Sequence, residues 1–227
     1  ISSGLFNHYP LIKNICKTRK PIFLSTGLAT IQEIDGVFKY LRLNKVKKVA
    51  LLHCCSLYPT PDSLVNLSTI KFFIDRYPSI PIGYSDHSLN DKSIIYSIVL
   101  GARIIEKHFT LDKNKLSFDH KISIEPKELR HLVAEIKNVE KMLGVYKKNL
   151  GIKEKKNRNI MRRYIVAKTN LYKDQIIKID DLSFKRLNKK KNIIGVENVE
   201  KILGKKLKRN LIKEDSIILS KIYEKKD

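Results

Sequence analysis

Short apolar runs alternate with helical patterns along the first half of this chain, and this alternation restricts the folds that it can adopt. Runs with the character of strands lie at residues 21–24, 46–53, 80–82 and 102–105. Amphipathic patterns typical of helices cover residues 31–41, 66–77 and 91–101. Because parallel strands need a long connection, which is usually a helix, the alternation predicts a parallel α/β fold.

Polar residues follow directly after two of these predicted strands. The sequence GYSDH occupies residues 83–87, and EKHF occupies residues 106–109. Because the carboxyl ends of parallel strands meet at one edge of a sheet, we expect His87 and His108 to lie together, each near a carboxylate. Two neutral imidazoles at such an edge can hold a divalent metal and leave its other positions open for a substrate. Taken singly, either histidine is better explained as a hydrogen-bonded structural residue.

Small hydroxyl residues occur at successive predicted strand ends, where they are suited to hydrogen-bonding a phosphate or carboxylate group. They are Ser3, Ser25, Thr26, Ser56 and Ser85. Each alone is more typical of a helix cap, whereas a ring of them indicates a binding site. The sequence contains no P-loop, glycine-rich dinucleotide fingerprint or nucleophile elbow, so it does not indicate the chemistries that those motifs support.

Composition bears on the partners and the compartment. The 227 residues carry 46 Lys and Arg against 23 Asp and Glu, but no repeated aromatic or arginine-rich motif. We interpret the charge as a solvated basic surface, with a basic site for anionic substrates as the alternative, and we expect no nucleic acid partner. The three cysteines make no disulfide framework, and no apolar run is long enough to cross a membrane. A cytoplasmic protein is therefore expected.

The texture of the sequence changes in its second half. A long amphipathic helix is predicted over residues 126–143, and the basic, weakly apolar residues 147–163 are interpreted as a linker. Short β-like runs then lie at residues 164–167, 175–179, 182–186 and 216–219. The sequence therefore predicts a catalytic domain over residues 1–146 and a small β-rich domain over residues 164–227.

Five longer motifs connect these observations. They read KPIFLSTG at residues 20–27, LHCCSLYP at 52–59, GYSDH at 83–87, IEKHFTLD at 105–112 and DHKISIEP at 119–126. In this order and spacing they resemble the sialic acid synthases, and the resemblance covers essentially the whole chain. It implies the C-terminal portion of a TIM (β/α) barrel, followed by the small β-rich antifreeze-like (SAF) domain that this family carries.

The resemblance also implies an activity. Synthases of this family condense phosphoenolpyruvate with N-acetylmannosamine and give N-acetylneuraminate and phosphate. They require a divalent metal, Mn²⁺ or Mg²⁺, and here His87 and His108 match its ligands. In the family an arginine of the antifreeze-like domain reaches the sugar in the partner subunit, so the match with Arg186 implies a domain-swapped homodimer.

Further residues are carried over by their positions in the motifs. Asp119 and Glu106 are the expected catalytic residues, and Asp119 matches the residue that holds the sugar hydroxyls. The residues expected to bind substrates are Ser3, Thr26, Ser56, Tyr58, Ser85 and Arg186. Ser3, Thr26 and Ser85 match groups on phosphoenolpyruvate. Ser56 stands where the family often has Asn, and Tyr58 lines the same pocket.

Two departures from the family leave other interpretations open. Leu5 stands where the family usually has an acidic residue, and the resemblance begins in mid-barrel, so we expect open sheet edges and an incomplete phosphate site. One alternative is a synthase for a related nonulosonic acid, such as legionaminic acid; Asp119 followed by His120 argues against the pseudaminic acid branch, where Asp-Ser is expected. The other is a non-catalytic remnant that acts as a carbohydrate-binding or interaction module.

Overall fold

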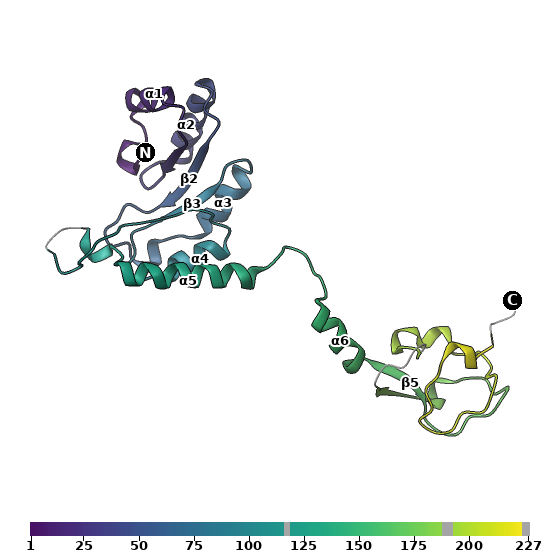
Figure 1. The fold of residues 1–227 in the computed structure, drawn as a ribbon. Helices are drawn as coiled ribbons and strands as arrows, with labels where there is room; N and C mark the ends of the chain where they lie inside the picture. Colours follow the sequence, from purple (N-terminus) through teal and green to yellow (C-terminus); the bar gives the residue numbers. More distant parts are fainter. Residues whose placement is uncertain (116–118, 188–192, 224–227) are drawn as a thin grey trace. The chain divides into compact units, whose positions relative to one another are not determined.

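The structure is a computed structural model that describes residues 1–115, 119–187 and 193–223 (Figure 1). The chain divides into two compact units, residues 1–146 and residues 147–227. Within the described ranges, none of the helices combines the length and apolar character that a membrane span requires.

A parallel sheet organises the first unit. Its strands, in spatial order, are β1 (Ile22–Ser25), β2 (Val49–Cys54), β3 (Ile82–Asp86) and β4 (Ile105–Lys107). Every neighbouring pair is parallel, so the α/β prediction is confirmed. Each strand lies next to the one before it in the chain, which is the strand order of a (β/α) barrel. In the part of the chain that the structure describes, the sheet has four strands and does not close on itself (Figure 1).

Short segments cover part of each outer edge of this sheet. Beside β1, the Ile1 amino group donates to the Phe23 carbonyl over 2.8 Å, and Ser25 N donates to the Ile1 carbonyl over 3.0 Å. Beyond β4, Ile124 N donates to the His108 carbonyl over 2.7 Å, and Phe109 forms a parallel bridge with Ile124. The expected open edges are thus each partly capped by a few residues.

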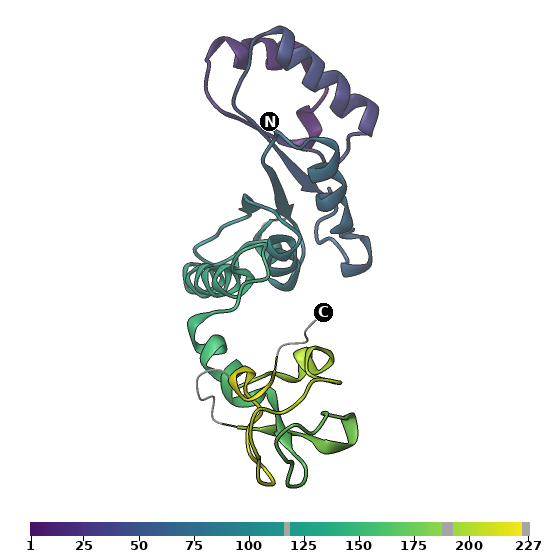
Figure 2. The same cartoon turned by 90° about the vertical axis from the view of Figure 1, so that its right-hand side faces the viewer.

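Amphipathic helices follow the strands and supply most of the core of the first unit. The helices are α1 (Tyr9–Lys17), α2 (Ile31–Leu43), α3 (Ser68–Arg76), α4 (Lys92–Val99) and α5 (Pro126–Leu143), with short 3-10 turns η1 (Ser3–Leu5), η2 (Asp62–Leu64) and η3 (His120–Ile122). Helix α2 begins with a capping box in which Thr30 and Glu33 satisfy each other's backbone N–H groups, and it buries the predicted apolar face. Helix α5 lies against α4 (Figure 1 and Figure 2).

The second unit has its own apolar core around an antiparallel pair of strands. Its elements are α6 (Ile152–Met161), β5 (Arg163–Ala167), η4 (Ile179–Asp181), β6 (Leu182–Arg186), η5 (Val196–Lys201) and η6 (Leu219–Lys221). Ile165, Ile202 and Ile217 are fully buried in this core.

Two sequence interpretations of this region differ from the structure. Residues 147–163, interpreted as a linker, contain helix α6 and group with the second unit. The β-like runs at residues 175–179 and 216–219 form only isolated bridges, among them Ile176 with Lys206 and Val166 with Ser216. Their β-branched composition predicts strands, but only Ile177 and Ile217 are buried, and the backbone pairing beside them is too short for a ladder.

Candidate active site

A cavity of about 280 Å³ opens at the carboxyl edge of the parallel sheet. Seven of the residues singled out from the sequence line it together, namely Ser3, Ser25, Tyr58, Ser85, His87, Glu106 and His108. Larger pockets of about 790 and 720 Å³ exist elsewhere, but they contain neither the histidines nor the predicted catalytic carboxylates. We therefore place the candidate site by its chemistry rather than by its size.

The two histidines converge at this edge because they follow the adjacent strands β3 and β4. Their ring centroids are 5.2 Å apart. The Nδ1 of His87 lies 2.8 Å from the Cys55 carbonyl oxygen, and since a carbonyl only accepts, Nδ1 carries the hydrogen. The Nε2 of a neutral His87 is then the atom with a free lone pair, as a metal ligand requires. The ring of Tyr58 packs 4.2 Å from the His87 ring.

The surroundings shift the two imidazoles in opposite directions. Burial by itself lowers the pKa of His87, but contacts with the Cys54 thiol and the Cys55 carbonyl outweigh it, so that the pKa is raised above 6.5. Burial lowers the pKa of His108, although Asp119, with Oδ2 3.7 Å from the His108 Nδ1, opposes that effect. Of the two, His108 is therefore neutral down to the lower pH.

The residues present fit a divalent metal held by few protein groups. Nowhere in residues 1–115, 119–187 and 193–223 do three or more His, Cys, Asp or Glu side chains gather in the way that a closed metal site needs. The His87 and His108 imidazoles with one ring nitrogen free can supply two ligands, which leaves the remaining positions for water or substrate oxygens. The donor set thus suits an open site that binds substrate.

A hydrogen bond joins two of the predicted site residues across the sheet. Ser85 on β3 and Glu106 on β4 are register partners, and the Ser85 hydroxyl donates to Glu106 Oε1 over 2.7 Å. The Glu106 side chain lines the cavity beside both histidines. Its carboxylate is therefore oriented by Ser85 and open to a ligand, the arrangement that a proton-transfer group needs.

Small groups close the opposite side of the cavity. Gly27 N donates to the Ser3 hydroxyl over 2.9 Å, and the Ser3 and Ser25 hydroxyls lie 3.3 Å apart. A Cβ at Gly27 would meet Ser56 Oγ at 2.1 Å and Ser3 Oγ at 2.7 Å, so only glycine leaves these hydroxyls in place. The Gly27 N–H holds the Ser3 hydroxyl in place, and the Ser3 and Ser25 hydroxyls both line the cavity, where they can donate to an anion.

The Cys54 thiol lies behind this corner, 3.7 Å from Ser3 Oγ and 3.8 Å from His87 Nδ1. Burial raises the pKa of Cys54, but contacts with His87, Ser25 and Ser3 outweigh that effect and bring the pKa to about 7. The thiol is buried, so it acts on the site through His87 and Ser3 rather than by facing the cavity.

Other predicted residues lie outside the lining of the cavity. Thr26 is buried and donates its hydroxyl to the Leu52 carbonyl over 2.9 Å, whereas its neighbour Ser25 lines the cavity. Ser56 Oγ is buried and has no hydrogen-bond partner among the described residues. Asp119 stands beside His108 with an exposed carboxylate. Arg186 ends β6 in the second unit and is exposed.

The sequence interpretation missed a buried ion pair next to the site. Lys107 Nζ lies 2.5 Å from Asp86 Oδ2 and donates to the Ser88 carbonyl over 2.7 Å. The Tyr84 hydroxyl donates to Asp86 Oδ1 over 2.7 Å. Burial raises the pKa of Asp86, but the Lys107 charge and these hydrogen bonds outweigh it and lower the pKa below 3.8. Opposite charges at register partners on β3 and β4 were the signal that could have indicated this pair.

Comparisons with known proteins agree with this geometry. The model described as the NeuB family matches residues 1–148. An uncharacterized protein of Methanocaldococcus jannaschii is 43% identical and covers 96% of this chain and 63% of its own length. The N,N'-diacetyllegionaminic acid synthase of Campylobacter jejuni is 39% identical, over 96% of this chain and 64% of that protein. The N-acetylneuraminate-9-phosphate synthase of Homo sapiens is 31% identical, over 96% and 60%. The chain thus spans less than two thirds of the length of these relatives.

Solved structures match in the same way. The N-acetylneuraminic acid synthetase of Leptospira borgpetersenii, crystallised with citrate, is 35% identical with a TM-score of 0.66, over 71% of this chain and 57% of that chain. The spore coat polysaccharide biosynthesis protein E of Chromobacterium violaceum has a TM-score of 0.80 over 99% of this chain and 67% of that chain; at 24% identity it shows a shared fold alone.

Proposed function

This chain belongs to the NeuB family, and from that premise we propose that it contributes to a synthase that condenses phosphoenolpyruvate with N-acetylmannosamine and one water molecule, giving N-acetylneuraminate and phosphate. One observation carries the proposal. His87, His108, Glu106 and Ser85 line a single cavity at the carboxyl edge of a parallel sheet, where (β/α) enzymes carry out their chemistry.

We assign His87 and His108 as the residues that would hold Mn²⁺ or Mg²⁺. When bound, such an ion polarises a carbonyl oxygen, so that the aldehyde carbon of the sugar becomes electrophilic toward C3 of phosphoenolpyruvate. Tyr58 packs on His87 and limits the positions that its ring can adopt. The exposed carboxylate of Asp119 is assigned to the sugar hydroxyls, consistent with its place beside His108.

Glu106 is assigned the proton transfer, and the hydroxyl corner is assigned the anionic substrate. The Ser85 hydroxyl orients the Glu106 carboxylate through its 2.7 Å hydrogen bond. We assign the phosphoenolpyruvate contact on β1 to Ser25 rather than Thr26, because the Thr26 hydroxyl is already bonded to the Leu52 carbonyl. Ser3 is the second hydroxyl of that corner, held there by the Gly27 N–H. Ser56 lies behind it, against Gly27, and supports the corner from outside the lining of the cavity.

The second unit is proposed to be the antifreeze-like (SAF) domain of a domain-swapped homodimer, with Arg186 directed at the N-acetyl group of a sugar in the partner subunit. Its exposed position at the end of β6 is compatible with this role. A second candidate substrate is the diacetamido sugar that leads to N,N'-diacetyllegionaminic acid. The 39% identity to the Campylobacter jejuni synthase, against 31% to the Homo sapiens relative, supports including it.

The test is phosphate release from phosphoenolpyruvate in the presence of Mn²⁺ and either sugar. A closed barrel of this type has eight strands, and the described part of this chain has four. The assay therefore uses the chain alone and a chimera in which the preceding barrel segment of the Campylobacter jejuni relative is joined to Ile1. Turnover in either protein supports the proposal, and the faster sugar identifies the substrate. Absence of turnover with both sugars in a folded chimera would contradict it and favour a binding module.

A further inference from the structure

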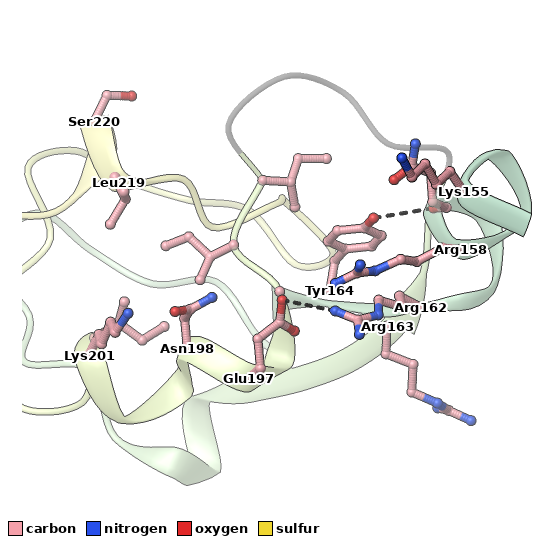
Figure 3. Close-up of a pocket in the computed structure, with 15 residues that line it drawn as sticks. Lys155, Arg158, Arg162, Arg163, Tyr164, Glu197, Asn198, Lys201, Leu219 and Ser220 are labelled. Atoms are coloured by element: carbon pink, nitrogen blue, oxygen red, sulfur yellow. Dashed lines mark hydrogen bonds and ion pairs between the residues drawn. The ribbon is translucent and has the colours of Figure 1, made fainter. Parts of the chain in front are cut away.

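The second unit contains a pocket of about 790 Å³ whose lining residues all belong to that unit (Figure 3). Its walls come from helix α6, the start of β5, residues 193–202 and the two residues Leu219 and Ser220. Ligand sites for small molecules commonly have volumes of roughly 300–1,000 Å³, so this pocket has room for one.

The walls of this pocket carry an unusual excess of positive charge. Its cationic residues are Lys155, Arg158, Arg162, Arg163 and Lys201, and Glu197 is the single acidic residue among the described residues that line it. Glu197 Oε1 lies 3.5 Å from the Arg162 guanidinium, so one of these charges is already paired (Figure 3). Arg163 points away from the others (Figure 3). Its guanidinium donates to the Phe184 carbonyl over 3.0 Å.

Three cations therefore remain available to a ligand. In the described part of the chain, no hydrogen bond or ion pair engages the side-chain nitrogens of Lys155, Arg158 or Lys201. Like charges around one concavity repel one another, and a bound anion relieves that repulsion. A guanidinium such as that of Arg158 also matches the geometry of phosphate oxygens, to which it can donate two parallel hydrogen bonds.

The floor of the pocket is apolar, and its side chains are buried. Tyr164, Ile194 and Ile202 are buried, with exposed fractions of 5%, 6% and 0%. The Tyr164 hydroxyl donates to the Asn159 carbonyl over 3.2 Å, which ties α6 to β5 along one wall (Figure 3). A ligand with an apolar part and an anionic group would thus meet apolar side chains at the floor and cationic side chains in the walls.

We propose that this pocket binds a small phosphomonoester that carries an apolar or aromatic part. The phosphate lies beside Lys155 and Arg158, which stand together at one end of the pocket (Figure 3), and the apolar part lies against the floor of Tyr164, Ile194 and Ile202, toward Lys201 at the other end. Two or more unpaired cations suit a dianionic phosphate better than a single carboxylate charge. The proposal is independent of the synthase activity, because none of the residues that line this pocket is assigned a role in that activity.

Phenyl phosphate is a suitable probe, titrated into the full chain by calorimetry at low ionic strength. Arg158→Gln is expected to weaken binding about tenfold, the equivalent of one charge-assisted hydrogen bond. Glu197→Gln is expected to tighten it several-fold, because it removes the acidic group and frees Arg162. The matched control is Arg209→Gln, which removes the same charge from an exposed position of the same unit outside the pocket.

Several results would overturn the assignment. Equal weakening by Arg158→Gln and Arg209→Gln would show diffuse attraction to a basic surface. An affinity that both Arg158→Gln and Glu197→Gln leave unchanged would place the probe elsewhere, for example in the cavity of the first unit. Benzoate bound as tightly as phenyl phosphate would exclude a phosphate site. The melting temperature of each variant is compared with that of the parent chain, to show that the variants remain folded. No change is expected, because Arg158 and Glu197 are exposed.

Discussion

Lys107 Nζ lies 2.5 Å from Asp86 Oδ2, and each of these buried residues directly precedes one of the two site histidines. The exposed fractions of the two side chains are 8% and 0%. Because His87 and His108 continue the same backbone, this ion pair fixes the ends of β3 and β4 from which both imidazoles project. The pair therefore links the stability of the first unit to the geometry of the site.

Replacing Lys107 by Met should destabilise the fold strongly. The Asp86 carboxylate would remain buried without its counter-charge, and breaking a buried pair in this way costs roughly 3–5 kcal/mol. Urea denaturation measures the free energy of unfolding. The control is Lys113→Met, which breaks the exposed pair with Glu128 and should cost about 0–1 kcal/mol. Similar losses in the two variants would refute the structural role of the pair.

The same pair predicts how stability changes in acid. The pKa of Asp86 is below its ordinary 3.8 in the folded protein, so its stabilising contribution is complete above that pH. As the pH falls from about 4 through the lowered pKa, the carboxylate takes up a proton and the contribution is lost. Lys107→Met should flatten this acid dependence in the same urea experiment.

Glu106→Gln should abolish most of the proposed synthase activity while the fold is retained. The amide keeps the shape of the side chain but cannot exchange a proton, and loss of a general acid or base typically costs on the order of 10²- to 10⁴-fold in kcat. Ser85→Ala should have a smaller effect, about tenfold, because it removes only the orienting hydrogen bond. Glu135→Gln, an exposed carboxylate of α5, should have no effect. Normal turnover of Glu106→Gln would exclude its proton-transfer role.

Mn²⁺ binding should depend on both histidines and on pH. His87→Ala or His108→Ala should weaken Mn²⁺ binding by at least about 100-fold. Changes to residues that only hydrogen-bond to a metal ligand already lower metal affinity about 10- to 100-fold, and these changes remove the ligand itself. Paramagnetic resonance of free Mn²⁺ measures the affinity. His131→Ala, on the exposed face of α5, is the control.

The pH dependence follows from the raised pKa of His87. A protonated imidazole cannot bind a metal, so the affinity should fall about tenfold per pH unit once the pH is below that pKa. Because the pKa lies above 6.5, the fall begins at a higher pH than for an ordinary histidine. The lowered pKa of His108 should steepen the fall only at more acidic pH. An affinity that is constant from pH 8 to pH 5 would contradict the assignment.

Gly27→Ala should impair phosphoenolpyruvate binding more than stability. The new methyl group would displace the Ser56 and Ser3 hydroxyls, which lie 2.1 and 2.7 Å from its position, and both can rotate away at modest cost. We expect a loss of about 1 kcal/mol in stability and about a tenfold rise in KM for phosphoenolpyruvate. Gly4→Ala adds a methyl group where no atom lies within 4 Å, and it should change neither quantity. An unchanged KM in Gly27→Ala would remove the hydroxyl corner from the substrate site.

Arg186→Ala tests the proposed contact with the sugar of a partner subunit. The KM for the sugar should rise about tenfold, with the dependence on phosphoenolpyruvate unchanged, because one charge-assisted hydrogen bond is lost. The comparison is Arg209→Ala in the same unit. In a mixed dimer of an Arg186→Ala chain and a Glu106→Gln chain, a site shared between subunits combines the intact Glu106 of one chain with the intact Arg186 of the other. Activity of such mixed dimers would therefore support a shared site. No change in the KM for the sugar would discard the contact.

Much of the fold and part of the site followed from local sequence patterns. The alternation of strand and helix fixed the parallel order of β1 to β4, and His87, His108 and Glu106 then met at one edge because parallel strands end together. Such patterns act over a few residues, so they can be recognised in the chain itself. The boundaries were less well predicted: the strand expected at residues 46–53 runs from Val49 to Cys54.

Only the tertiary structure decided which neighbours these residues have. It turned Ser25 rather than Thr26 to the cavity, directed His87 Nδ1 to the Cys55 carbonyl, and joined Asp86 to Lys107 inside the sheet. It also folded residues predicted as a linker into one wall of a basic pocket. These features depend on strand register, rotamers and burial, which arise from contacts between residues distant in sequence and are set when the whole core packs.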